Sequence, residues 1–185
     1  IRDVRTCLEF RRVLFRSEAV DLLAERRDSV FVGPAIAWEI CYLTHCESIG
    51  VARQTVINQG YEREIEATVA TVAKLREAGI RMVVGGDYGI SIAPHGTYAK
   101  DLEYFVEYFD MRPLEALRCA TTYGGLAFDP KGSVGTLTAG SMADLVIVDG
   151  APDQDIRVLQ NHDLLTVMKG GTLYRDLANQ NPYLA

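Results

Sequence analysis

The sequence has 185 residues, of which 48% are hydrophobic and 24% charged, and its formal net charge at pH 7 is −6. A chain of this length and composition can bury a globular core, which excludes a wholly disordered protein. The acidic balance argues against a nucleic-acid surface, and no apolar stretch approaches the roughly 18 residues of a membrane span. We therefore expect a soluble, cytoplasmic protein with no nucleic-acid or membrane contact.

The first 17 residues, IRDVRTCLEFRRVLFRS, differ from the rest in charge. They hold five arginines and two acidic residues, a net of +3, which leaves −9 for residues 18–185. An Arg-rich, acid-poor start is typical of a targeting peptide. The stretch LEFRRVLFRS at 8–17 instead resembles the in-frame translation of a sequencing-library adapter, as in a chimeric metagenomic read. We favour this second interpretation, which makes residues 1–17 foreign to the fold and the residues from Glu18 onward the later part of a longer protein.

From Glu18 the pattern alternates between helix and strand. EAVDLLAERRD at 18–28 predicts a helix that buries Val20, Leu22 and Leu23, and SVFVGPAIAW follows as an apolar strand that ends at a Gly-Pro pair. The clearest helix is YEREIEATVATVAKLREAG at 61–79, where apolar residues recur at three- and four-residue steps and a glycine closes the pattern. IRMVVGG is the next predicted strand.

The second half of the chain begins with two more predicted helices. They are AKDLEYFVEYF at 99–109 and RPLEALRCATTYGG at 112–125, the latter with Pro113 in its first turn. Beyond them GSVGTLTAGSMADLVIVDG is rich in turns and holds a four-residue apolar strand, before which Asp144 should cap a turn. LLTVMKGGTLYRD at 164–176 predicts a hairpin around two glycines.

The four cysteines, Cys7, Cys41, Cys46 and Cys119, show no disulfide framework. Two of them flank His45 in CYLTHC, a spacing that suggests zinc. Structural zinc sites commonly take four ligands from paired Cys-x₂₋₄-Cys spacings, and the sequence has no second pair. We favour unbridged thiols on a helix of a protein from a reducing compartment.

The elements divide into an α/β part, residues 18–130, and a small mostly-β part, residues 131–185. Apolar strands that alternate with helices imply parallel pairing with right-handed crossovers. Two such units do not close a sheet on their own. They fit either the edge of an open doubly wound sheet or the last two units of an eight-fold barrel, and periodicity leaves both open.

Three stretches in order, GGDYG…PHGTYAKDLEYFVE, RPLEALRCAT and GSVGTLTAGSMADLVIVDG, carry a family resemblance. Together they resemble the C-terminal third of the amidohydrolase superfamily, nearest its imidazolonepropionase-like and dipeptidase-like hydrolases, and the likeness runs from about Glu18 to Asp176. The resemblance implies that residues 18–130 are the last two βα units of a metal-dependent (β/α)₈ barrel. It also implies that residues 131–185 are the C-terminal part of a small β-sandwich.

The same resemblance places VVGGD at the end of the final barrel strand. Asp87 would then bind the catalytic divalent metal, expected to be one or two zinc ions, and would pass a proton from metal-bound water to the leaving group. A metal lowers the pKa of its water toward about 7, so a nearby carboxylate can accept that proton. His95 and Tyr88 would contact the small-molecule substrate from the loop that follows this strand. Each also has an ordinary interpretation: a loop aspartate bonded to backbone N–H groups, a turn histidine and a packed tyrosine.

The family's other ligands, a His-x-His pair, a bridging lysine or acid and two later histidines, have no counterpart in this sequence. One carboxylate does not hold zinc, which takes three or four ligands. We therefore expect an inactive fragment of a hydrolase that cleaves amide-like C–N bonds in a cyclic amide or a dipeptide. The open strand edge at 29–35 should make the isolated chain self-associate, so a homo-oligomer is an expected state.

Two other hypotheses stay open. The chain could be a self-contained α/β module that binds an anion at the glycine-rich loop after Val84, although the aspartate of GGDYG would repel phosphate. It could also be a non-catalytic homologue with the same barrel. A change of Asp87 to Asn separates these hypotheses, because only a hydrolase would lose turnover.

Overall fold

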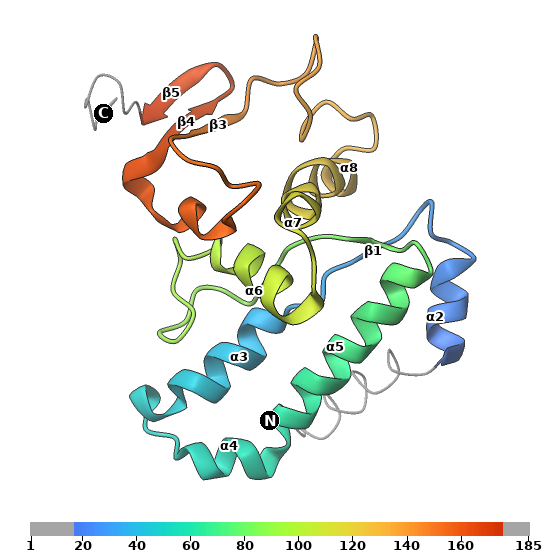
Figure 1. The fold of residues 1–185 in the computed structure, drawn as a ribbon, viewed down its shortest axis with the longest axis vertical. Helices are drawn as coiled ribbons and strands as arrows, with labels where there is room; N and C mark the ends of the chain where they lie inside the picture. The colour runs from blue at the N-terminus through green and yellow to red at the C-terminus, as the bar shows by residue number, and fades with distance from the viewer. Residues whose placement is uncertain (1–16, 176–185) are drawn as a thin grey trace. The chain divides into compact units, whose positions relative to one another are not determined.

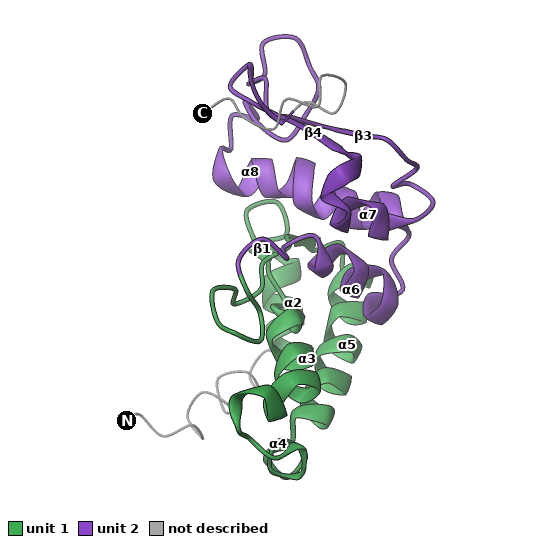
Figure 2. Cartoon of the chain, turned by 90° about the vertical axis from the view of Figure 1, so that its left-hand side faces the viewer, with its two compact units in different colours: residues 1–94 green, residues 95–185 purple. Residues whose placement is uncertain are grey.

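The computed structural model describes residues 17–175, which form two compact units that divide between Pro94 and His95 (Figures 1 and 2). Residues 1–16 and 176–185 lie outside the described residues. Cys7 and all but the last residue of the segment predicted to be foreign therefore lie outside them as well. The described chain begins with the first residue of a helix, Ser17.

The first unit consists of helices around a two-stranded sheet. Its elements are α2 (Ser17–Ala24), β1 (Phe31–Val32), α3 (Ile36–His45), η1 (Cys46–Ile49), α4 (Arg53–Gln59), α5 (Tyr61–Glu77) and β2 (Arg81–Met82). The two strands pair in parallel, with Phe31 opposite Arg81 and Val32 opposite Met82. The predicted parallel pairing is thus confirmed, and α3 and α5 lie side by side in the connection between the strands (Figure 1).

The core of the first unit follows the apolar spacing of its helices. Val72 and Leu75 on α5 are buried, as the three- and four-residue steps predict, and Gly79 follows the helix at a φ of 76°. Leu75 packs with Val20 of α2 and with Ile80, which precedes β2. Val20 is buried and Leu23 partly buried, as predicted, but Leu22 is 49% exposed, which corrects its place in the predicted face.

The second unit joins helices to a small antiparallel sheet. Its elements are α6 (Lys100–Phe109), α7 (Pro113–Arg118), the π-helix η2 (Cys119–Tyr123), α8 (Gly124–Phe128), β3 (Leu145–Val148), η3 (Ile156–Gln160), η4 (His162–Leu164), β4 (Leu165–Lys169) and β5 (Thr172–Arg175). The strand order is β3-β4-β5, which confirms the predicted hairpin at 164–176. The helix predicted over 112–125 is three successive helical segments with a π turn in the middle.

The compact units divide at a different place from the predicted boundary between 130 and 131. Helix α6 belongs with the C-terminal residues because the Gln160 amide donates a 2.9 Å hydrogen bond to the Glu103 carboxylate. Burial raises the pKa of Glu103, but hydrogen bonds from Lys100 and Gln160 outweigh burial and hold that pKa below its ordinary value. The predicted boundary between residues 130 and 131 refers to two family domains and not to compact units, and it stays a prediction.

In the second unit the loop around Val134 packs backbone against backbone on η2 and α8. An added Cβ at Gly125 would lie 2.3 Å from the Val134 carbonyl oxygen, and one at Gly135 would lie 2.3 Å from the Thr121 carbonyl oxygen. Side-chain carbons do not approach that closely, so only glycine fits either position without a backbone shift. The close contact alone accounts for Gly125, and at Gly135 it adds to a φ of 82° that itself favours glycine.

Replacing Gly135 with Ala should destabilise the second unit more than replacing Gly140. Both glycines have positive φ values, 82° and 92°, but an added Cβ at Gly140 meets nothing within 4 Å. Alanine therefore causes backbone strain at both positions. The difference in unfolding free energy between the two variants, about 1–3 kcal/mol, then measures the close contact between residue 135 and the Thr121 carbonyl oxygen. Urea unfolding of both variants measures it. Equal losses in the two variants would contradict the tight packing.

Asp144 stabilises the turn between β4 and β5. One carboxylate oxygen accepts the Gly170 backbone N–H at 2.7 Å and the other accepts the Lys169 ammonium at 2.7 Å. Asp144 therefore caps a turn 26 residues away and not the turn before its own strand, which corrects the expectation from the sequence. The hydrogen bond from Lys169 is the main reason that the pKa of Asp144 lies below its ordinary value.

This lowered pKa predicts a pH-dependent hairpin. Because the folded state favours the charged carboxylate, its stabilisation is fully present above the unfolded pKa of about 3.9 and is lost as the pH falls through the folded value. Amide exchange at Gly170, compared between pH 5 and lower pH, should show protection that declines in the native chain. In Asp144→Asn the protection should be weaker at pH 5 and nearly constant. Asp153→Asn, at another exposed site, is the control and should behave like the native chain.

Candidate functional site

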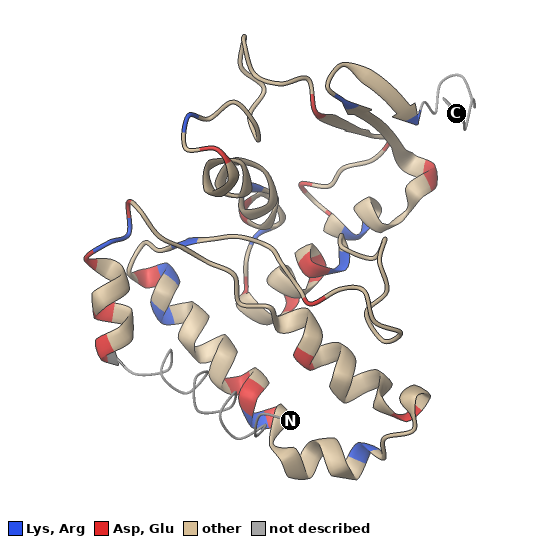
Figure 3. Cartoon of the chain, turned by 180° about the vertical axis from the view of Figure 1, so that it is seen from behind, with Lys and Arg blue, Asp and Glu red and all other residues tan. Residues whose placement is uncertain are grey.

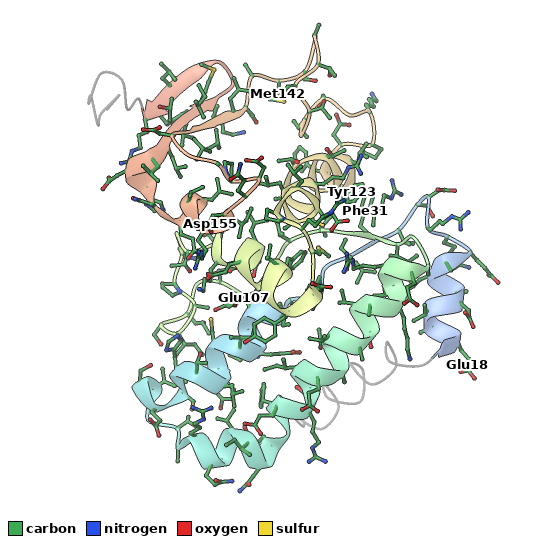
Figure 4. The ribbon with its side chains drawn as sticks, in the orientation of Figure 1. Glu18, Phe31, Glu107, Tyr123, Met142 and Asp155 are labelled. Atoms are coloured by element: carbon green, nitrogen blue, oxygen red, sulfur yellow. The ribbon has the colours of Figure 1, made fainter. Side chains whose placement is uncertain are left out.

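The parallel pairing places the carboxyl ends of β1 and β2 at the same edge of the sheet. The pairing extends past the strands, since the Val83 N–H donates a 3.0 Å hydrogen bond to the Val32 carbonyl oxygen. Phe31 of β1 is labelled in Figure 4. The Arg81 guanidinium of β2 lies 4.2 Å from the centroid of its ring. Ligand sites of parallel α/β sheets form at the carboxyl ends of the strands, so a functional site is expected at this edge.

The backbone follows a different path after each of the two strands. After β1 the chain turns at Ala35, whose φ of 50° is rare for a residue with a side chain, and α3 begins at the next residue. After β2 the chain passes through Gly85 and Gly86 to Asp87, where the Tyr88 N–H donates a hydrogen bond to the Gly86 carbonyl oxygen. The loop beyond is closed by hydrogen bonds from the Gly89 N–H to the Ala93 carbonyl oxygen and from the Ala93 N–H to the Ile90 carbonyl oxygen.

Asp87 lies five residues after Met82, the last residue of β2, and its side chain is exposed. Within residues 17–175 no hydrogen bond or ion pair involves its carboxylate. The ordinary interpretation of Asp87, a loop aspartate that accepts backbone N–H groups, requires such bonds and is not supported. Asp87 is thus an exposed carboxylate in the loop that follows β2, accessible to a cation or to a proton.

The other two predicted site residues differ in their surroundings. Tyr88 follows Asp87, its backbone N–H donates to the Gly86 carbonyl oxygen at 3.0 Å, and its side chain is half-buried with a buried hydroxyl, as the packing interpretation expects. His95 belongs to the second unit, in the turn before α6. It is exposed, and its Nδ1 lies 2.6 Å from the Tyr98 hydroxyl. The structure thus brings Asp87 and Tyr88 into one loop and gives His95 a different partner.

The residues that the structure describes do not form a metal centre by themselves. Among them no group of three His, Cys, Asp or Glu side chains is placed to hold an ion. His45 ends α3 beside the buried Cys46, and no disulfide joins Cys41, Cys46 and Cys119. A single carboxylate at the sheet edge does not satisfy a divalent metal, so no catalytic step through a metal can be derived from these residues.

A pocket of about 190 Å³ lies beside the end of β1, and the sequence did not reveal it. Apolar side chains such as Val72 and Leu75 line it together with Glu39, which is only 4% exposed. The Thr68 hydroxyl donates a hydrogen bond of 3.3 Å to the Glu39 carboxylate. One signal was present: Glu39 is the only acidic residue in the apolar helix α3, and such a residue is buried only when hydrogen-bonded.

Charged residues give no sign of a second kind of site. Lys and Arg are scattered among Asp and Glu along the described chain in Figure 3, without a basic stripe. The predicted lack of a nucleic-acid partner remains a prediction. No helix among residues 17–175 combines the length and apolar character that crossing a bilayer requires.

Comparison with known proteins identifies the family. The model of the amidohydrolase family matches residues 13–174, which is most of the chain. The chain therefore belongs to the amidohydrolase family. The match also includes residues 13–17, the end of the segment predicted to be foreign.

Individual relatives agree with this family. Ochratoxinase of Aspergillus niger is 27% identical over 171 residues, which are 91% of this chain and 34% of ochratoxinase. Its crystal structure superposes with a TM-score of 0.71 at 26% identity, covering 86% of this chain and 35% of that one. A Xaa-Pro dipeptidase with methionine bound in its active site gives a TM-score of 0.69 at 27% identity, covering 87% and 38%. The chain thus spans about a third of the length of these relatives and shares the corresponding α/β part of their fold.

We expect the 185-residue chain to hold no stoichiometric zinc, because its described residues offer one carboxylate at the sheet edge and zinc takes three or four ligands. The metal content of the purified chain after dialysis against a zinc-containing buffer measures this. Asp87→Asn should leave the content unchanged. One zinc ion per native chain that disappears in Asp87→Asn would show that the chain completes a metal centre by itself.

Proposed function

We propose that the protein to which this chain belongs hydrolyses amide-like C–N bonds, in a cyclic amide or a dipeptide-like substrate, with Asp87 at the reacting centre. The observation that carries the proposal is the Asp87 carboxylate. It is exposed in the loop that follows β2, five residues after Met82, and has no hydrogen-bond partner within the described residues. A carboxylate that makes no hydrogen bond within the described fold is accessible to a metal ion or to a substrate.

The relatives support this class of reaction. The chain belongs to the amidohydrolase family, and one similar structure is a dipeptidase crystallised with methionine, an amino acid, in its active site. The family supports hydrolysis of an amide-like bond, and the dipeptidase supports a substrate with an amino-acid part. They do not separate a dipeptide from a cyclic amide, and both remain within the proposal.

Each site residue has a proposed role. Asp87 supplies one oxygen ligand to a divalent metal, which we take to be zinc, and accepts a proton at its carboxylate during hydrolysis. His95 contacts the substrate, and Tyr88 lines the site beside Asp87. When bound, the metal would supply an activated water. Because the described residues hold only one such ligand at the edge, the 185-residue chain itself is proposed to be inactive.

Asp87→Asn in the full-length protein tests the proposal. The amide has nearly the same size as the carboxylate but accepts no proton, so kcat for an amide substrate should fall by roughly 10²–10⁴-fold or more. The matched control is Asp28→Asn, which changes another exposed aspartate of the first unit and should retain turnover. Rates are measured with a set of dipeptides and cyclic amides, and circular dichroism checks that both variants fold.

Two outcomes would point to the other hypotheses. Turnover that survives Asp87→Asn would remove Asp87 from the chemistry. A full-length protein that hydrolyses none of these substrates and binds one of them equally well with Asp87 or Asn would be a binding protein on the same fold.

A further inference from the structure

His95 and Tyr98 form a pair of side chains in the turn that leads into α6. The Tyr98 hydroxyl lies 2.6 Å from Nδ1 of His95, and the two rings are tilted by 56° with centroids 6.0 Å apart. Both side chains are exposed, and Tyr98 is 52% exposed. Exposed polar side chains gain little stability by pairing with each other, so a contact this close calls for another explanation.

The backbone holds the pair in place. Gly96, between the two residues, has a φ of 93°, which glycine adopts without strain and which turns the chain back on itself. The carbonyl oxygens of Thr97 and Tyr98 accept the N–H groups of Lys100 and Asp101, at 3.0 and 3.1 Å, in the first turn of α6. Helix α6 is anchored in turn by buried side chains such as Phe105. Tyr98 therefore stands on a rigid element and can fix the orientation of the His95 ring.

The chemistry of the two groups decides which of them donates. A neutral imidazole has one nitrogen that donates and one that accepts, and a phenol keeps its proton at neutral pH. The phenol O–H is the stronger donor, and the bare imidazole nitrogen is a stronger acceptor than the phenol oxygen. A distance of 2.6 Å also suits an O–H donor better than a ring N–H donor, whose usual distance is about 2.9–3.0 Å.

We propose that Tyr98 donates to Nδ1 of His95 and so keeps the proton of His95 on Nε2, where it serves as the hydrogen-bond donor for a substrate carboxylate. Tyr98 is then a positioning residue and His95 the residue that touches the substrate. The carboxylate part of the proposal rests on the proposed function, since an amino-acid-type substrate carries such a group. The choice of tautomer does not; it rests on the 2.6 Å contact and on the donor and acceptor strengths of the two groups.

Nitrogen-15 NMR of the histidine-labelled chain tests the tautomer. The chain has three histidines, and His95→Asn and His162→Asn assign their signals. At a pH where His95 is neutral, its ring should show a protonated Nε2 and a bare Nδ1. In Tyr98→Phe, which removes only the hydroxyl, the two ring nitrogens should move toward the averaged shifts of a tautomer mixture. Tyr174→Phe, at another exposed tyrosine of the same unit, should leave the signals unchanged. A proton on Nδ1 in the native chain, or no response to Tyr98→Phe, would overturn the proposal.

A pair of probes tests the carboxylate in the full-length protein. N-acetylglycine carries a carboxylate, and N-acetylglycinamide replaces it with a neutral amide. N-acetylglycine should shift the Nε2 signal of His95, and Tyr98→Phe should weaken its binding by about 2- to 10-fold, the worth of one ordinary hydrogen bond. N-acetylglycinamide should give smaller shifts and no dependence on Tyr98. Equal responses to the two probes, or no response of His95 to either, would overturn the carboxylate assignment. Neither measurement needs turnover. If the Asp87→Asn experiment contradicted the hydrolase proposal, the NMR and binding results would still decide the roles of His95 and Tyr98.

Discussion

The parallel pairing of β1 and β2 is the constraint on which the first unit depends. Each strand has only two residues, and the hydrogen bond from Val83 to Val32 adds one step to the pairing. Such a short pair would not persist alone, so its stability must come from the helices that connect and cover it. Val72 and Leu75 on α5 supply buried apolar surface next to the strands. Because the strands are parallel, that packing also decides where Asp87 emerges.

The second unit is held together by a different kind of contact. The loop around Val134 contacts η2 and α8 through backbone atoms, at Gly125 and Gly135, where no side chain fits. This contact joins the helical part of the unit to the segment that leads into β3. Each unit therefore positions its candidate site residue through a rigid framework: the sheet for Asp87, and helix α6 for His95 and Tyr98.

Local patterns in the sequence predicted most of the elements. The spacing in α5, the proline at the start of α7 and the glycines between β4 and β5 each determine local structure through propensity alone, and all three predictions are confirmed. The errors and omissions involve contacts between distant residues. The buried Glu39 depends on Thr68, the role of Asp144 depends on Gly170, and the exposure of Leu22 depends on what α2 packs against. Periodicity carries no information about such pairs. Asp87 is a related case, because a lone aspartate after a strand acquires meaning only from the family resemblance and from its open surroundings.

The bond between Asp144 and the Gly170 backbone also determines how the small sheet is assembled. Asp144 directly precedes β3, whose first residue, Leu145, pairs with Met168 of β4. If β3 slipped by one residue along β4, every side chain of β3 would change face, and the Asp144 carboxylate would move about 3.4 Å from the turn that it caps. The hydrogen bond from the Gly170 N–H to the Asp144 carboxylate therefore fixes the register of β3 on β4. A strand of only four residues, Leu-Val-Ile-Val, has similar side chains on both faces and would otherwise discriminate poorly between two alignments.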